Sequence, residues 1–281
     1  MWIKLALREV SPELLVAVRV SLGFLFGLVV VVIQKVKIPK SLNEWIPLIL
    51  IGITNFAAPF FLISWGEKAI DSSVASILDA TVPLFTVFLA HFLLRDDRMT
   101  AAKILGLFAG FAGVIVLLSK DIGASSSTLY GEGAVVLASI FYAGSAVYIR
   151  KTTQNTPGVL RSTIPMLSAS VIMWITTLLT EDQIQIPKLQ LTWIALLFLG
   201  LIGSGIAFIL AFYLIHEIGP TRATMVTYIF PLGGVILGVM FLNEPITWQL
   251  LAGGILIVAS LTIVNYKPSE NFSIGKTAAE S

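Results

Sequence analysis

Residues 45–94, WIPLILIGITNFAAPFFLISWGEKAIDSSVASILDATVPLFTVFLAHFLL, recur in outline at residues 193–242, a constant 148 positions later. Thirteen of the fifty aligned pairs are identical. The most informative identical pairs are Trp45/Trp193, Gly52/Gly200 and Pro83/Pro231. Two apolar segments share leucines by chance, but shared tryptophan, glycine and proline at one shift indicate an internal repeat.

The composition places this repeat in a membrane. Of the 281 residues, 57% are hydrophobic and 12% are charged, and the mean hydropathy is +0.93. A soluble domain carries about 25% charged residues, so this chain has too few to cover a soluble surface. A soluble enzyme, a disordered chain and a nucleic-acid binder are therefore excluded. The net charge of +2 does not indicate a polyanionic partner, and the absence of cysteine excludes disulfides.

Nine stretches are long and apolar enough to cross a bilayer as helices, which takes about 20 residues each. They are residues 12–33, 45–66, 72–94, 100–118, 133–149, 163–179, 192–215, 223–242 and 248–264. The alternation of a β-barrel is absent from them. The predicted fold class is an all-α polytopic membrane protein, whose partner is the lipid bilayer.

The repeat divides the chain into two copies of opposite orientation. Each repeated segment lies an odd number of spans from its copy, so the copies cross the bilayer in opposite directions, as in secondary transporters. The predicted parts are a first repeat (1–118), a connecting loop (119–132), a second repeat (133–266) and a polar tail (267–281).

The first repeat has four predicted spans and the second has five. A shift of 145 aligns Pro12 with Pro157, which places the counterpart of the span at 133–149 before residue 1. We therefore expect a ten-helix plan of two five-helix bundles whose first helix is missing, through truncation or a misassigned start. A genuine nine-helix protein is the alternative.

Lysine and arginine residues set the predicted orientation. The loop after the first span holds Lys35 and Lys37, and alternate loops hold most of the other basic residues. Basic loops stay on the cytoplasmic side of a membrane. The C-terminus is therefore expected in the cytoplasm, with the protein in the plasma or inner membrane.

The combined pattern resembles the EamA-type family of the drug/metabolite transporter superfamily. Residues 55–71 (NFAAPFFLISWGEKAID) and 75–100 look like the family's third and fourth helices, and residues 103–118 are similar to its fifth. The segment NEPIT at 243–247 is the corresponding motif of the second repeat. Its Glu244 matches Asp96 in the first repeat. The resemblance covers nearly the whole chain and implies two domains of five helices in a transporter. Asp79 departs from the pattern, because relatives often carry asparagine there.

Two charged residues lie within predicted spans. Asp79 is the only acidic residue well inside one, where a carboxylate costs roughly 2.5–3.5 kcal/mol. Contact with a substrate amine, proton coupling, and a wetted or hydrogen-bonded acid all remain open for it. Arg19 could bind an anionic substrate, although we favour a structural pairing or an interfacial position.

Polar and aromatic residues within the spans are candidates to line a transport pathway. They are Asn55, Trp65, Tyr142, Ser204 and Tyr228. His91 is placed near the inner end of its helix and His216 in a loop. Because these two histidines are far apart and lack a carboxylate at ligand spacing, no metal site is predicted.

Proline and glycine residues suggest how the helices bend and pack. Pro83 and Pro231 recur at matched positions, where each would kink its helix. Glycine pairs at GxxxG spacing let helix backbones approach. They are Gly23/Gly27, Gly106/Gly110 and Gly234/Gly238. We favour packing within one chain for them, and a homodimer remains possible.

The predicted function is secondary transport of a small polar metabolite, amino acid or amine-like, by alternating access and with export as the expected direction. No cofactor is predicted, and no ATP-binding motif is present. A sugar-phosphate or nucleotide-sugar exchanger of the same superfamily is the alternative, although such anions would need more buried basic residues than Arg19. An intramembrane enzyme or a non-transporting assembly factor is the alternative of another class.

Overall fold

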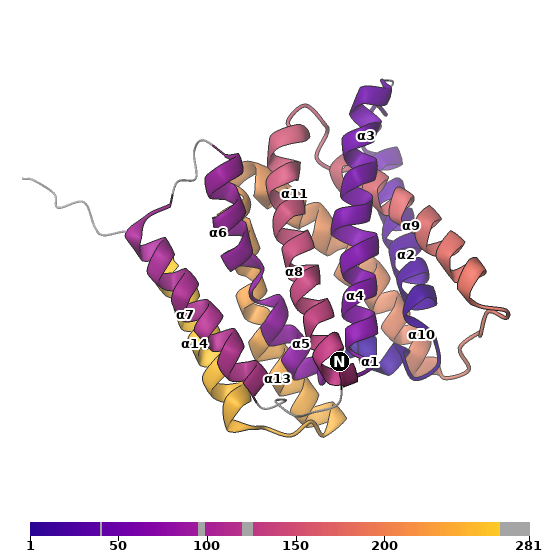
Figure 1. Ribbon diagram of the computed structural model, residues 1–281. Helices are drawn as coiled ribbons and strands as arrows, with labels where there is room; N and C mark the ends of the chain where they lie inside the picture. Colours follow the sequence, from indigo (N-terminus) through magenta and orange to yellow (C-terminus); the bar gives the residue numbers. More distant parts are fainter. Residues whose placement is uncertain (40, 95–98, 120–125, 265–281) are drawn as a thin grey trace, which may run out of the picture.

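The computed structural model describes residues 1–39, 41–94, 99–119 and 126–264, and these residues form a bundle of helices (Figure 1). Within these ranges, seven helical segments are long and apolar enough to cross a membrane, and two shorter apolar helices, Ile229–Leu242 and Trp248–Val264, follow them. The predicted all-α polytopic fold is confirmed. The predicted tail, residues 120–125 of the predicted connecting loop and Asp96 lie outside the described residues.

The first repeat contains one short helix and four apolar segments, of which two are interrupted. Its elements are α1 (Trp2–Ala6), α2 (Pro12–Ile33), α3 (Leu42–Ile51), the π-helical η1 (Gly52–Ala57), α4 (Ala58–Gly66), α5 (Ser72–Asp79), α6 (Val82–Leu93) and α7 (Ala101–Leu118). Ser11 and Thr100 cap α2 and α7, because their side chains accept hydrogen bonds from the first helical turn (3.1 and 3.3 Å).

The second repeat follows the same plan with one additional helix at its start. Its elements are α8 (Ser126–Thr152), α9 (Leu160–Thr180), α10 (Gln190–Leu197), the π-helical η3 (Phe198–Ile206), α11 (Ala207–Ile218), α12 (Pro220–Ala223), the 3₁₀-helical η4 (Thr224–Tyr228), α13 (Ile229–Leu242) and α14 (Trp248–Val264). The π-helical segments η1 and η3 therefore occupy matching places in the two repeats, as do α7 and α14.

Both prolines predicted to kink a helix follow an interruption. The helix predicted over 72–94 stops at Asp79 and restarts at Val82, with Pro83 in the first turn of α6. Pro231 likewise lies in the first turn of α13, after the 3₁₀ segment η4. The first turn tolerates proline because its N–H groups have no partner within the helix.

Two helix ends differ from the sequence-based prediction. Helix α8 begins at Ser126, seven residues before the predicted start at Gly133. His216 was predicted in a loop, which is wrong: it lies in the last turn of α11. That helix continues to Ile218 and ends because Gly219 adopts a positive φ of 85°, which glycine adopts without strain.

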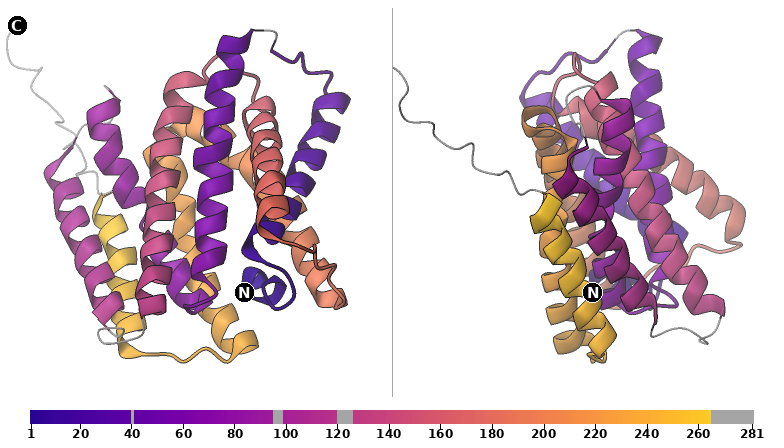
Figure 2. Two further views of the ribbon diagram at one scale, coloured as in Figure 1. Left: turned by 45° about the vertical axis from the view of Figure 1, so that its right-hand side comes forward. Right: turned by 60° about the vertical axis from the view of Figure 1, so that its left-hand side comes forward.

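Glycine faces join helices of the two repeats. Figures 1 and 2 show α7 beside α14 at one edge of the bundle and α2 near α9 at the other. A Cβ on Gly106 would approach Val264, whereas one on Gly113 would lie 2.9 Å from the carbonyl oxygen of Gly253, so α7 and α14 run antiparallel. The predicted glycine pairs thus pack within the chain, and a homodimer stays a prediction.

Replacing Gly253 with alanine is expected to destabilise the protein by about 1–3 kcal/mol, because the new Cβ would lie 2.8 Å from the Gly113 carbonyl oxygen. The matched control is Gly133→Ala in α8, where a Cβ meets nothing within 4 Å. Unfolding by heat and denaturant in detergent measures both. Equal stability of the two variants would contradict this packing.

Two apolar cores share the described residues. The first core is formed mainly by α2, α4, α9 and α11 and includes Phe56, Phe60 and Phe212. The second core is formed by α5, α6, α7 and α14 and includes Leu78 and Leu84. Each core draws helices from both repeats. Arg19 lies on α2, a helix of the first core, and Asp79 ends α5, a helix of the second.

Candidate functional site

Arg19 extends from the middle of α2 towards the π-helical segment η3. Its Nε donates to Ser204 Oγ at 2.8 Å, and Nη2 donates to the Gly203 carbonyl oxygen at 3.4 Å. Its guanidinium carbon lies 3.6 Å from the centre of the Phe60 ring, which is a cation–π contact. The predicted structural pairing of Arg19 is therefore present, and its partners are uncharged.

Arg19 has no carboxylate in direct contact among the described residues. No carboxylate of the described residues lies within 4.0 Å of its guanidinium group. Two ion pairs of the described residues are instead made by Lys4, with Asp71 and Glu244. Arg19 does interact electrostatically, at longer range, with Tyr142, Glu67 and Asp79. Charged side chains within a membrane pair with one another or with backbone carbonyl groups, and Arg19 does the latter at Gly203. Its charge is therefore still available to an anionic group.

Asp79 is the last residue of α5, and its position does not stabilise a negative charge. Its Oδ1 is buried and has no hydrogen-bond partner among the described residues. The C-terminal end of a helix carries the negative end of the helix dipole, which disfavours a carboxylate. An ionised Asp79 therefore needs a cation, and a neutral one needs a proton.

Aromatic rings form one wall next to Arg19. Phe56, Phe60, Phe208 and Phe212 contact one another, with ring centres 4.7–6.0 Å apart. Tyr142 on α8 extends this wall, with its ring centre 6.4 Å from that of Phe60. Phe56, Phe60 and Phe212 are at most 1% exposed and belong to the first core. The partly buried groups Arg19, Asp79 and Tyr142 interact electrostatically with one another beside them.

Glu67 is a second buried acid near this site, which the sequence reasoning missed. It follows α4 directly, is 6% exposed, and its Oε2 has no hydrogen-bond partner among the described residues. Phe60, Ser64 and Glu67 fall at i, i+4 and i+7, which is one face of a helix. That spacing was the available signal, but Glu67 stands at the edge of its span and its repeat partner is Ile215.

The surroundings of Glu67 favour its neutral form. Burial raises its pKa above the ordinary value of 4.5, while the amino group of Met1, Lys4 and Arg19 act in the opposite direction and Glu244 adds to the rise. The folded protein therefore holds this proton more tightly than the unfolded chain does. The contribution of Glu67 to the free energy of unfolding is fully present below pH 4.5. It is lost as the pH rises through the raised pKa.

Glu67→Gln is consequently expected to flatten the pH dependence of stability. The amide resembles the protonated acid, so the variant should equal the parent near pH 4 and exceed it increasingly at neutral and alkaline pH. Thermal unfolding in detergent across this range measures the difference. A constant difference between the two proteins at every pH would contradict the raised pKa.

Of the predicted pathway residues, Asp79, Tyr142 and Ser204 interact with Arg19. Ser204 binds Arg19, and Asn55 is buried in η1 with Nδ2 unpaired among the described residues. Trp65 instead is 41% exposed and lines a groove on the outside of the bundle with Lys68 and Tyr130. The backbone of Tyr228 lies in η4, and its side chain lies outside the described part of the structure.

Comparisons with known proteins agree with this architecture. The profile of the EamA-like transporter family matches residues 1–119 and 129–266. The chain is 23% identical over 262 residues to the uncharacterized transporter YoaV of Bacillus subtilis (strain 168), covering 92% of this chain and 88% of YoaV. It is 27% identical over 264 residues to the uncharacterized inner membrane transporter YedA of Escherichia coli (strain K12), covering 93% and 84%.

A solved crystal structure has the same fold. It superimposes with a TM-score of 0.71 at 20% sequence identity, over 94% of this chain and 93% of that one. The family match covers both repeats of a multi-pass helical bundle, and the relatives are transporters by name. The chain therefore belongs to the EamA-like transporter family and is a membrane transporter.

Proposed function

We propose that the transported substrate is a zwitterionic amino acid. The observation that carries this proposal is the pair of opposite charges, Arg19 and Asp79, each without an ionic partner within 4.0 Å among the described residues. Arg19 would bind the carboxylate of the substrate and Asp79 its ammonium group. The adjoining wall of phenylalanine rings supports an apolar or aromatic substrate side chain.

The charge balance of the site argues against phosphorylated substrates. Arg19 interacts electrostatically with two acids, Asp79 and Glu67, so with Arg19 charged the net charge of these three groups is at most +1, and it falls to 0 or −1 as the acids ionise. A sugar phosphate carries about two negative charges and would meet a single cation. A zwitterion adds no net charge, so its entry leaves the electrostatic energy of the site least disturbed.

The proposed mechanism is alternating access, with the substrate bound between the two cores. Inverted repeats support it, because two conformations related by the repeat would open the same site to opposite faces. Export as the direction rests on the family resemblance, and a cytoplasmic C-terminus rests on the basic loops. Reporter fusions at the C-terminus test this orientation.

Counterflow in proteoliposomes tests the substrate class. Vesicles are loaded with a large neutral amino acid and then given the same amino acid, its decarboxylated amine, its deaminated acid, or a sugar phosphate, each radiolabelled. We expect rapid uptake of the zwitterion and slow uptake of the other three. The matched control is Trp65→Phe, which changes a side chain on the outside of the helix bundle and should transport normally. Exchange of the sugar phosphate, or of none of the four, would overturn the proposal.

A further inference from the structure

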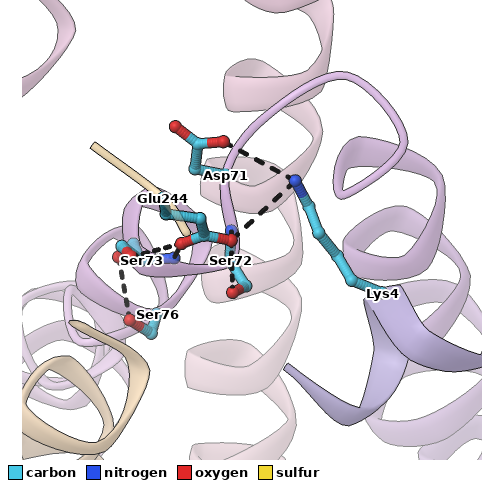
Figure 3. Close-up of polar contacts among 6 residues, drawn as sticks. All are labelled: Lys4, Asp71, Ser72, Ser73, Ser76 and Glu244. Carbon is cyan, nitrogen blue, oxygen red and sulfur yellow. Dashed lines mark hydrogen bonds and ion pairs between the residues drawn. The ribbon is translucent and has the colours of Figure 1, made fainter. Parts of the chain in front are cut away.

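Glu244, in the loop between α13 and α14, binds the start of α5 in the other repeat. Its Oε1 accepts hydrogen bonds from the backbone N–H and the hydroxyl of Ser72, at 2.8 and 2.7 Å. Its Oε2 accepts from the backbone N–H of Ser73, at 2.9 Å, and from the hydroxyl of Ser73 (Figure 3). The residue is 7% exposed, so this four-fold contact is shielded from water.

The position suits a carboxylate. The first N–H groups of a helix lack partners within it, and the helix dipole adds positive potential there. Asp71, the residue preceding α5, makes no side-chain capping hydrogen bond, so Glu244 supplies the cap from 171–172 residues away. Burial acts to raise the pKa of Glu244, but the hydrogen bonds from Ser73 and Ser72 outweigh it and lower that pKa. Glu244 thus stays ionised at neutral pH.

Two further contacts are made at the start of α5. Lys4 Nζ on α1 lies 3.9 Å from Glu244 Oε1 and 3.7 Å from Asp71 Oδ1. Helix α13 approaches α5 closely at Gly238, where a Cβ would lie 2.5 Å from Ser73 Oγ. Three segments of the chain therefore meet at the N-terminus of α5, on the face of the bundle opposite the basic loops.

The other end of α5 is Asp79, the acid of the proposed substrate site. Ser72 and Asp79 are seven residues apart, or about 10 Å along a helix. Ser139 Oγ on α8 shares its single proton between the carbonyl oxygens of Val135, at 3.1 Å, and Leu78, at 3.2 Å, so α8 contacts that end of α5. A rigid helix of this length transmits any displacement of its start to Asp79.

We propose that Glu244 is a positioning residue that keeps the outer face of the transporter closed, by fastening α5 to the second repeat and so holding Asp79 at the substrate site. The part concerning Asp79 rests on the proposed function. The closure itself needs no knowledge of the substrate, and its assignment to the outer side rests on the proposed orientation.

The absence of cysteine from the chain allows a direct test. Ser64 is 0% exposed, lies two residues before the outer end of α4, and differs from cysteine by one atom. Ser64→Cys therefore reports opening of the outer face through its labelling by a membrane-impermeant maleimide. The label is applied to right-side-out and to inside-out vesicles.

We expect Glu244→Gln to raise the labelling rate of Cys at this position at least tenfold from the outer side, without raising it from the inner side. Ser72→Ala/Ser73→Ala should produce a smaller increase in the same direction. Combining the two serine changes with Glu244→Gln should raise the labelling rate little beyond that of Glu244→Gln alone, because all three changes remove the same interaction. The matched control is Glu13→Gln, a glutamate in the first turn of α2 on the same face.

Several results would overturn the closure. One is a folded Glu244→Gln protein, with an unchanged thermal midpoint, that labels like Glu13→Gln. Another is faster labelling from both sides alike, which a general loosening would produce. If Glu244→Gln does not fold, Ser72→Ala/Ser73→Ala decides, since it leaves the carboxylate in place. Faster outer labelling in a protein that exchanges no amino acid would support the closure and refute the proposed substrate.

Discussion

Asp79→Asn is expected to reduce exchange of a zwitterionic amino acid by about 30-fold or more. Removing one partner of a desolvated charge pair costs about 2–5 kcal/mol, and each 1.4 kcal/mol is a factor of ten in affinity. Asparagine has the size of aspartate but offers the substrate ammonium no charge. The loss should therefore appear mainly as a higher KM in proteoliposome uptake.

Specificity gives this prediction a second readout. The parent protein should prefer the zwitterion to its deaminated acid, and Asp79→Asn should remove that preference, because the acid lacks only the group that Asp79 would bind. Asp182→Asn, an exposed acid in the α9–α10 loop, is the control and should behave like the parent. Unchanged KM and unchanged preference in Asp79→Asn would refute a substrate contact at this residue.

Arg19→Lys is expected to lower the same exchange by about 10- to 100-fold, although it keeps the positive charge. The guanidinium donates to Ser204 through Nε while its plane lies over the Phe60 ring. A lysine ammonium is a point charge without this planar fork, and charged hydrogen bonds are worth about 1.5–3 kcal/mol each. Initial rates over a range of substrate concentrations measure the change.

Arg19→Gln extends this test by removing the charge. This variant should lose the preference for the zwitterion over its decarboxylated amine, which is the reverse of the change expected at Asp79. Arg8→Lys, at an exposed position before α2, serves as the control. If Arg19→Gln kept the preference for a carboxylate, Arg19 would be a structural residue alone.

Much of the fold follows from the sequence, because bilayer thickness and hydropathy fix the spans without reference to tertiary contacts. The repeat also indicates which helices correspond. The interruption between Asp79 and Val82 was not predictable in the same way. Pro83 signals a disturbance, but whether the helix kinks or stops depends on neighbours such as Ser139 that satisfy the freed carbonyl groups. The early start of α8 at Ser126 has a related cause, since serine and glycine are poor helix formers whose local preference tertiary packing overrides.

The candidate site was partly predictable for an equally physical reason. Asp79 and Arg19 stand out because a charge within an apolar span is costly and needs an explanation. Glu67 and Glu244 lie at span ends, where acids are common, so their burial depends on contacts that no local pattern shows. The match of Glu244 with Asp96 in the repeat marks equivalent places but does not show that a carboxylate caps a helix of the other repeat.

The pairing of α5 with α13 and of α7 with α14 has a consequence for how the protein is made. Helices leave the ribosome in chain order, and domains fold as their parts emerge. The glycine face of α7 and the N-terminus of α5 therefore enter the membrane long before their partners exist, whereas α2 meets α9 earlier. The second core closes only when the last two helices have been inserted, so assembly of this transporter is completed from its C-terminal end.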